Sequence, residues 1–398
     1  MLKIAVIFED SPFDRKGRFN AVHNRIVHLA ATGECTVDPY CLHSVDSAFV
    51  RRFRHTVKVP HKKTVEVDGT RYRMLWYRFS LLDWFLTERL HRPPCRYRRF
   101  MKRILPRFRD YDVIIAHSYE GAVLAYEINK AYGIPFYVTW HGSDIHTHPM
   151  RNPLVLRMTA AAMDAAECNF FVSRTLMAAS DAISETARKS VLYNGASDDF
   201  CRFGDEERLA LRREYGIPED DKVVAFVGNL VSVKNAAVLP RLFHRIAEEY
   251  DGALKFWIIG DGKLRGEIEP HLLADASVDV GFLGNRPAEE MPRLMNCIDV
   301  LVLPSLNEGL PLVTIEALKC GANVVGSYAG GIPEVIGRDF CVPLSEPPSA
   351  PADSRFVNSF AVKVASLLAV PKEQALADEF SWETTAYAEL SAMARHIH

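Results

Sequence analysis

Short apolar runs recur along the chain, and segments of helix length separate them. Nine such runs, apolar at consecutive positions, begin near residues 3, 111, 135, 168, 223, 254, 278, 299 and 322. Runs that are apolar on both faces and alternate with helices predict parallel sheets covered by helices on two sides. Nine strands exceed one compact doubly wound sheet, so the pattern predicts two α/β domains.

A polar stretch at residues 194–207, rich in Gly, Ser and Asp, predicts the linker between the two domains. We therefore expect two Rossmann-like domains that face each other across a cleft. The first occupies residues 1–196 and the second residues 197–382. A C-terminal helix at about 383–398 is expected to pack back on the first domain.

Charge and composition narrow the functional classes. The 398 residues are 48% apolar and 25% charged, which is ordinary for a globular protein and excludes collagenous or largely disordered chains. The net charge of −2 argues against a nucleic-acid partner. The charge is unevenly distributed, however. Residues 1–200 hold 29 basic and 21 acidic side chains, whereas residues 201–398 hold 19 basic and 29 acidic ones.

Cysteine usage and hydropathy indicate a cytoplasmic protein. The eight cysteines form no CxxC pair, which argues against a zinc module or a disulfide framework. No window supplies the roughly 18 continuous apolar residues that a spanning helix needs. The amino terminus, MLKIAVIFED, is typical of a first strand and not of a secretory signal.

The segment at residues 299–321, DVLVLPSLNEGLPLVTIEALKCG, contains the strongest chemical signal. It predicts a buried strand to Pro304, a polar loop, and a helix from about Pro311 to a stop at Gly321. The free amides of Leu312 to Thr314 would then lie at the carboxyl edge of the sheet, where phosphate groups bind. Glu308 and Glu316 bracket these amides, and carboxylates beside a diphosphate suit sugar hydroxyls on either side of it. A nucleotide sugar has this layout.

The pair Glu308 and Glu316 also resembles the paired acids of retaining family 4 glycosyltransferases, which have the GT-B fold. Seven further motifs match that family in order along the chain: WHGSD (140–144), FVS (171–173), NG (194–195), VGNLVSVKN (227–235), IIGDG (258–262), VGFLG (280–284) and GGIPEVIG (330–337). The resemblance implies a glycosyltransferase that moves a sugar from a nucleotide diphosphate, UDP by preference, to an acceptor hydroxyl with retention. Polysaccharide, exopolysaccharide or glycolipid assembly is the expected setting.

The same resemblance assigns roles to individual residues. Glu316 would hold the ribose, and Glu308 would face the transferred sugar. Lys234 would contact the diphosphate and stabilise the leaving group, so His141, Glu308 and Lys234 are the expected catalytic residues. The other expected donor-binding residues are Gly228, Asn229, Gly260, Phe282, Leu283, Gly309, Leu310, Leu312 and Val313.

One position departs from the family pattern. Asn229 stands where many members have an arginine. An amide can hydrogen-bond a phosphate but cannot neutralise it. Either Lys234 and the helix amides suffice, or another cation such as Arg293 compensates.

In the first domain, the resemblance places His141 at the transferred sugar, with Asp144 holding its loop. Acceptor contacts are expected from Arg15, Gly17 and Asp144, although the usual glycine pair after the first strand is reduced here to Gly17. The mechanism that the resemblance implies needs neither a metal nor a cofactor. His146 and His148 lie close to His141, but they lack the spacing of a metal site.

Residues 51–109 carry 18 basic and 4 acidic side chains. Within them, residues 96–110 predict an amphipathic helix whose apolar stripe includes Tyr97, Phe100, Met101, Ile104, Leu105 and Phe108, with Pro106 as a possible early stop. The stripe could simply pack on the sheet. The basic face could also bind an anionic membrane, on the inner face of the plasma membrane, where a lipid-linked acceptor would be found.

Three alternatives remain on sequence alone. Gly260, Gly262 and Gly266 after an apolar run, with Asp279 beyond them, loosely match a dinucleotide-binding oxidoreductase. A nucleotide-sugar epimerase could share the fold. A catalytically silent nucleotide-sugar-binding protein would be consistent with Asn229.

Overall fold

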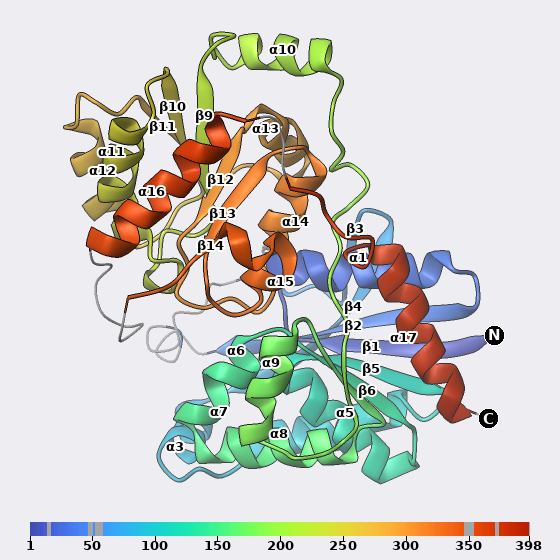
Figure 1. Ribbon diagram of the computed structural model, residues 1–398. Helices are drawn as coiled ribbons and strands as arrows, with labels where there is room; N and C mark the ends of the chain where they lie inside the picture. The colour runs from blue at the N-terminus through green and yellow to red at the C-terminus, as the bar shows by residue number, and fades with distance from the viewer. Residues whose placement is uncertain (14–16, 47–50, 52–58, 346–353, 371–373, 398) are drawn as a thin grey trace. The chain divides into compact units, whose positions relative to one another are not determined.

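The computed structural model describes residues 1–397 except 14–16, 47–50, 52–58, 346–353 and 371–373 (Figure 1). The chain divides into two compact units. Unit 1 comprises Met1–Asn194 together with Ser381–His398, and unit 2 comprises Gly195–Phe380. The sequence analysis places the boundary at 196/197. The Arg15 acceptor prediction lies outside the described residues.

Unit 1 is built on one sheet, which has eight strands within the described residues, in the order β3-β4-β2-β1-β5-β6-β7-β8. All neighbours are parallel except β3 and β4, which are antiparallel. The strands are β1 (Leu2–Phe8), β2 (Cys35–Asp46), β3 (Thr64–Val67), β4 (Thr70–Phe79), β5 (Val113–His117), β6 (Phe136–Trp140), β7 (Cys168–Phe171) and β8 (Lys189–Val191). The strands expected near residues 3, 111, 135 and 168 are confirmed; β2, β3, β4 and β8 were not predicted.

The α-helices described in unit 1 are α1 (Gly17–Ala31), α3 (Leu81–Glu88), α4 (Cys95–Ile104), α5 (Ser118–Tyr132), α6 (Ser143–His146), α7 (His148–Arg151), α8 (Pro153–Ala165), α9 (Arg174–Ala179) and α17 (Trp382–Ile397). Although α17 is the end of the chain, it packs beside α1. Its Thr385 hydroxyl donates to the carbonyl of Tyr193 at 2.7 Å. The C-terminal helix therefore belongs to the first unit.

The amphipathic segment at 96–110 is shorter than its pattern suggests. Helix α4 ends at Ile104, and a 3-10 turn, Leu105–Arg107, follows and contains Pro106. Phe100, Met101 and Ile104 are buried. The apolar stripe therefore packs into unit 1, as the simpler of the two interpretations expects, and the basic side chains remain outside.

Unit 2 contains a second, fully parallel sheet, with six strands in the described part of the chain, in the order β11-β10-β9-β12-β13-β14. The strands are β9 (Lys222–Val227), β10 (Leu254–Ile259), β11 (Val280–Gly284), β12 (Val300–Leu303), β13 (Asn323–Ser327) and β14 (Cys341–Val342). The covering helices are α10 (Asp205–Glu214), α11 (Leu239–Glu249), α12 (Arg265–Leu273), α13 (Met291–Cys297), α14 (Leu312–Lys319), α15 (Ile332–Ile336) and α16 (Ser354–Leu368). All five strands predicted in this half are confirmed.

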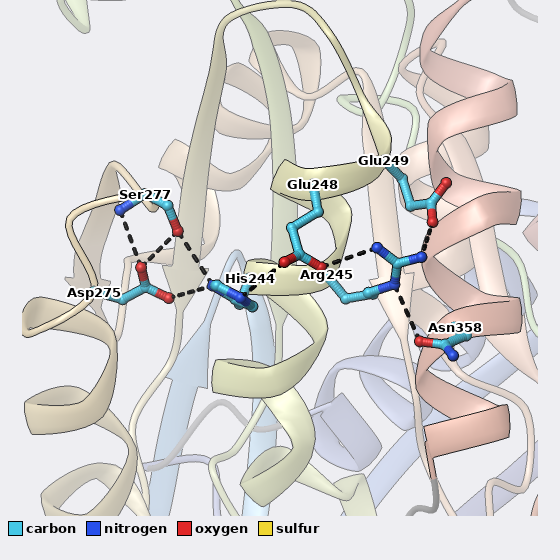
Figure 2. Close-up of polar contacts among 7 residues, drawn as sticks. All are labelled: His244, Arg245, Glu248, Glu249, Asp275, Ser277 and Asn358. Atoms are coloured by element: carbon cyan, nitrogen blue, oxygen red, sulfur yellow. Dashed lines mark hydrogen bonds and ion pairs between the residues drawn. The ribbon is translucent and has the colours of Figure 1, made fainter.

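Polar contacts on the outside of unit 2 join α11 to its neighbours (Figure 2). His244 lies 2.9 Å from the carboxylate of Asp275, beyond the end of α12. Arg245 donates to the Asn358 side chain on α16 at 3.1 Å. These groups are partly exposed to solvent, so each contact contributes about 1 kcal/mol or less to stability. The buried apolar face of α11, which includes Leu242, Phe243 and Ile246, holds the helix on the sheet.

Candidate functional site

The order of strands in unit 2 reverses direction between β9 and β12. The chain runs outward from β9 to β11, then returns to the other side of β9 and continues to β14. In open parallel sheets, ligands bind at such a reversal, outside the carboxyl ends of the two strands. The loops after β9 and β12 meet there, because the amide of Leu306 donates to the carbonyl of Val233 at 2.9 Å.

Lys234 and Glu308 form an ion pair at this reversal. Lys234 ends a short 3-10 turn after β9, and Glu308 lies in the loop between β12 and α14. The lysine Nζ is 2.6 Å from Glu308 Oε1, and both side chains are mostly buried. The family resemblance implies that Lys234 contacts the diphosphate and that Glu308 faces the sugar. The structure brings them together, although their roles stay predictions.

Two glycines allow close backbone approach around this pair. A Cβ on Gly330 would lie 1.9 Å from the carbonyl oxygen of Glu308, and the next amide, Gly331, donates to that oxygen at 3.1 Å. A Cβ on Gly260 would lie 2.1 Å from the carbonyl oxygen of Gly228. Because they lack a side chain, Gly330 and Gly260 allow the backbone to approach the loops that carry Glu308 and Gly228.

The same packing explains two of the three glycines of the dinucleotide-binding alternative, Gly260 and Gly262. Gly262 also lies against the loop after β9, where a Cβ would be 2.4 Å from the carbonyl oxygen of Leu230. The amide of Leu230 in turn donates to the carbonyl of Asp261 at 3.0 Å. These small residues serve contacts between two loops of unit 2.

Helix α14 begins one residue later than the sequence suggests, with Pro311 at its N-cap. The amide of Thr314 donates to the carbonyl of Pro311 at 3.1 Å. Of the three amides expected to be available to a phosphate, Leu312 to Thr314, only those of Leu312 and Val313 are therefore left for a ligand. Both residues are partly exposed, as an amide that meets a ligand requires. Gly309 and Leu310 lie in the loop that leads to them.

Glu316 lies on α14 between the fully buried Ile315 and Ala317, and it is itself partly buried. Burial raises the pKa of Glu316 to about 7. A carboxyl group in this environment ionises more readily when hydroxyl groups donate to it. This property suits the ribose-binding role that the sequence implies.

Phe282 and Leu283, the expected lining of the base pocket, lie on β11 at the edge of the sheet. The pairing of β10 with β11 shifts at this point, so that Ile259 lies opposite Gly284. Phe282 is partly exposed, and the guanidinium of Arg265 lies 5.6 Å from the centre of its ring. Arg265 is a cation near the predicted site that the sequence analysis missed.

Arg293, the cation named as a substitute for the arginine missing at Asn229, already has an acidic partner. Arg293 lies on α13 and pairs with Glu214 of α10 at 2.7 Å. Asn229 itself is exposed in the loop after β9. Lys234 therefore remains the basic residue that the described geometry places beside Glu308.

In unit 1, two histidines meet at the carboxyl ends of neighbouring strands. His141 follows β6, and His117 ends β5, with 3.1 Å between His141 Nε2 and His117 Nδ1. Burial is the main cause that lowers the pKa of each ring well below its usual range. Both rings are therefore neutral at pH 7, and His141 can exchange hydrogen bonds with a ligand without carrying a charge. His117 was missed, although its place directly after an apolar run was a usable signal.

Asp144 holds the loop that begins at His141. Its buried carboxylate accepts hydrogen bonds from the amides of His141, at 3.2 and 3.1 Å, and of Gly142, at 2.7 Å. Gly142 has φ of 146°, which a residue with a side chain rarely adopts. Because both carboxylate oxygens are engaged, Asp144 shapes the loop, and its contact with an acceptor stays a prediction. Gly17 is the first residue of α1.

Two arginines of unit 1 were also missed, a partly exposed one, Arg18, and a buried one, Arg25. Arg18 on α1 donates to the carboxylate of Asp10, which follows β1, at 2.8 and 2.9 Å. Arg25, about two turns further along α1, donates to the Asn194 side chain at 3.0 Å and lies 3.9 Å from Glu389 of α17. Asn194 of the NG motif therefore ties the end of unit 1 to α1.

Among the described residues, no group of three or more His, Cys, Asp or Glu side chains is placed to hold a metal ion. The same residues include no helix long and apolar enough to cross a membrane.

Two sequence families match the chain. The profile described as "Glycosyltransferase Family 4" matches residues 22–200, and the profile described as "Glycosyl transferases group 1" matches residues 207–368. The chain belongs to the family 4 glycosyltransferases. Its two Rossmann-like units are those of the GT-B fold, as the sequence resemblance implies, and the oxidoreductase alternative is excluded.

Curated relatives match over part of their length. The D-inositol 3-phosphate glycosyltransferase of Mycobacteroides abscessus is 33% identical over 159 residues, covering 38% of this chain and 34% of that protein. The protein of the same name from Corynebacterium urealyticum is 30% identical over 215 residues, covering 51% and 50%. The chain thus spans half or less of the length of these relatives.

Solved structures match over nearly the whole chain. HepE of Anabaena, in complex with UDP and glucose, has a TM-score of 0.66 and 16% identity, covering 99% of this chain and 100% of that one. Sucrose-phosphate synthase of Thermosynechococcus elongatus has a TM-score of 0.69 and 16% identity, covering 100% and 99%. At these identities the similarity concerns the fold alone.

Proposed function

We propose that this glycosyltransferase transfers a sugar from a nucleotide diphosphate to an acceptor hydroxyl, with retention of anomeric configuration. The observation that carries the proposal is the meeting of Lys234, Glu308 and the amino end of α14 at the strand reversal of unit 2. An ammonium group and helix amides suit a diphosphate, and an adjacent carboxylate suits sugar hydroxyls. Family membership supports the same reaction class.

UDP is the favoured leaving group. Structures of the same fold, those of Anabaena HepE, were solved with UDP and with UDP-glucose. In this chain, Glu316 would accept hydrogen bonds from the ribose, and Phe282 with Leu283 would line the base. The acceptor would be a glycan or a lipid-linked glycan in polysaccharide, exopolysaccharide or glycolipid assembly.

The reaction breaks the bond between the anomeric carbon and the diphosphate oxygen. Negative charge develops on the diphosphate as it leaves, and Lys234 with the α14 amides would stabilise that charge without a metal ion. The acceptor oxygen then bonds to the same face of the sugar, and its proton passes to the departing phosphate. Glu308 would orient the sugar and hold Lys234 in place before the donor binds.

The neutral pair His141 and His117 would act on the sugar through hydrogen bonds. His117 and Asp144 hold His141 from two sides, one through its ring and the other through its backbone amide. A neutral imidazole can accept a hydrogen bond from a sugar hydroxyl. Because it carries no charge, it does not destabilise the positive charge that develops at the anomeric carbon.

Slow hydrolysis of nucleotide sugars without an acceptor tests the proposal. Purified protein is incubated separately with UDP-, GDP- and ADP-sugars, and the released nucleotide and the anomer of the released sugar are measured. We expect release from one nucleotide class, with retention. Lys234→Ala should lower the rate by a factor of about 100 to 1,000, as the loss of a charge-stabilising group does. Arg245→Ala, which removes a partly exposed cation of α11, is the matched control.

Three results would overturn the proposal. Binding of nucleotide sugar without any turnover, with or without candidate acceptors, would indicate a silent binding protein. Conversion to an epimeric sugar would indicate an epimerase. Equal rates of donor hydrolysis for wild type and Lys234→Ala would show that Lys234 does not stabilise the leaving diphosphate.

A further inference from the structure

Helix α3 of unit 1 exposes more large apolar side chains than a short surface helix normally does. Its sequence is LLDWFLTE, and Leu81, Leu82 and Phe85 are 46%, 61% and 47% exposed. These positions fall on one face of a helix, because residues four apart are neighbours. Leu90, just beyond the helix, is 48% exposed. Contiguous apolar surface of this kind marks a contact with a partner or a membrane.

The opposite side of α3 is firmly anchored. Asp83 is buried and completes a capping box with the N-cap residue Ser80, whose amide and hydroxyl both donate to its carboxylate. At the other end, the Asn152 side chain donates to the carbonyl of Thr87 at 3.3 Å, which joins α3 to the start of α8. The helix is therefore held by polar groups on its inner side, and its apolar side chains point away from unit 1.

Asp83 also joins α3 to the basic helix α4. Its second oxygen accepts the amide of Arg96, near the start of α4, at 3.1 Å. Helix α4 contains no acidic residue, and its exposed cations are Arg96, Arg98, Arg99, Lys102 and Arg103. Within the described part of the chain, Arg98, Arg99 and Lys102 have no ion-pair partner. One buried carboxylate thus fixes an apolar helix beside a cationic one.

The positive charge continues beyond α4. A cavity of about 820 Å³ lies between its carboxyl-terminal end and strands β3 and β4. The cations in its lining are Lys63, Arg71, Arg73, Arg103 and Arg107. Arg73 pairs with Asp38 at 2.7 Å. The remaining cations extend the surface on which an anion would be attracted.

We infer that α3 and α4 together bind the surface of an anionic membrane, with the apolar side chains of α3 inserted among the lipids and the cations of α4 on the headgroups. Leu, Trp and Phe on one side with Arg and Lys beside them are the composition of interfacial helices. From charge, the sequence leaves a membrane contact of residues 51–109 open as one of two interpretations. The structure adds α3 as the inserted element, because the apolar stripe of α4 is buried in unit 1.

Charge complementarity favours a membrane over a second copy of this chain. Residues 81–109 carry nine Arg or Lys and two acidic residues, of which Asp83 is buried. Two copies meeting through this surface would bring like charges together. Anionic headgroups would instead neutralise them. This inference does not depend on which sugar the protein transfers.

Sedimentation with vesicles tests the inference. The full-length protein is mixed with vesicles of phosphatidylcholine, with and without phosphatidylglycerol, at low and high salt. We expect binding that requires phosphatidylglycerol and weakens with salt. The double variant Leu82→Ser and Phe85→Ser should bind at least about tenfold more weakly at both salt concentrations, because the apolar contribution is not screened. Its matched control is Leu273→Ser, which removes an apolar side chain 64% exposed in unit 2.

Neutralising the cations tests the second half of the surface. The triple variant Arg98→Gln, Arg99→Gln and Lys102→Gln should lose about fivefold in affinity for each cation at low salt and should lose most of the salt dependence. Quenching of Trp84 fluorescence by brominated lipid, absent in Trp84→Phe, would place α3 within the lipid.

The inference is overturned if the α3 double variant binds as wild type does. It is also overturned if the wild type forms dimers that depend on α3 and does not bind vesicles. Hydrolysis of a soluble nucleotide sugar should be unchanged in the α3 variants. A failure of the vesicle experiment and a failure of the proposed reaction are thus seen in separate assays.

Discussion

The carboxyl group of Glu316 should make the stability of unit 2 depend on pH. Its pKa of about 7 in the folded protein compares with an ordinary value of 4.5. The folded protein therefore binds this proton more tightly than the unfolded chain. Stability is full below about pH 4.5, falls as the pH rises toward 7, and stays low above that, because the charged form is buried. The difference of about 2.5 pKa units corresponds to at most about 3 kcal/mol.

Replacing Glu316 with glutamine should remove this cost. The amide of Gln has a similar shape and stays neutral at every pH. At pH 8.5 we expect Glu316→Gln to be more stable than wild type by up to about 3 kcal/mol, or up to about 10 °C in Tm for a unit of this size. At pH 4.5 the two proteins should differ little, because wild-type Glu316 is then protonated.

The assay is thermal unfolding of wild type and variant between pH 4.5 and 8.5. Glu267→Gln, which neutralises an exposed acid on α12, is the control and should follow the wild-type profile. If Glu316→Gln also ran parallel to wild type over the whole range, burial would not be holding a proton on Glu316. The structural reasoning about this site would then be wrong.

The same carboxyl group should also make the affinity for UDP depend on pH. Ribose hydroxyls that donate to Glu316 would favour its ionised form, so that UDP binding would release a proton near neutral pH. We expect the affinity for UDP to fall below pH 7 by up to about tenfold per pH unit. In Glu316→Gln the affinity should be lower and independent of pH. If the variant kept both the wild-type affinity and its pH dependence, Glu316 would not be the residue that binds the ribose.

Other predictions follow from single contacts. Gly330→Ala should lower donor hydrolysis and Tm well beyond Gly216→Ala, because both glycines have positive φ but only Gly330 lies against a carbonyl; equal effects in the two variants would mean that the crowding is harmless. Arg25→Met should destabilise unit 1 by about 3 kcal/mol, since it leaves a buried carboxylate without its cation, and hydrogen exchange in α17 should rise; unchanged exchange would contradict this coupling. His117→Phe should lower kcat more than it raises KM, with partial recovery in His117→Asn, and equal kcat in all three proteins would show that His141 needs no partner.

The sequence predicts the part of the fold in which each strand is buried on both faces. The strands that carry the expected donor residues are continuous apolar runs, because helices cover both sides of a parallel sheet. The loops after them contain Gly, Pro and acidic residues at positions where the backbone must turn or approach another loop. Gly330 is one such case, since its neighbour is the carbonyl of Glu308. Composition, spacing and family resemblance therefore point to the same edge of the sheet in unit 2.

The strands toward one edge of the unit 1 sheet have a less regular sequence pattern, and they were not predicted. Strand β2 contains Asp38 and Pro39, and β4 alternates exposed arginines with buried Tyr72 and Met74. Such strands lack the continuous apolar run by which buried strands are identified.

The contacts of His117, Arg25 and Asp83 were beyond sequence analysis for a different reason. Each depends on a partner that is distant along the chain or has no fixed spacing: a second histidine, the C-terminal helix, and the first turn of the next helix. A polar residue is buried only where such a partner compensates for lost water, and sequence spacing does not reveal that partner. The residues expected to bind the donor can thus be recognised from local pattern, whereas those that position His141 and α3 become visible only when the chain is folded.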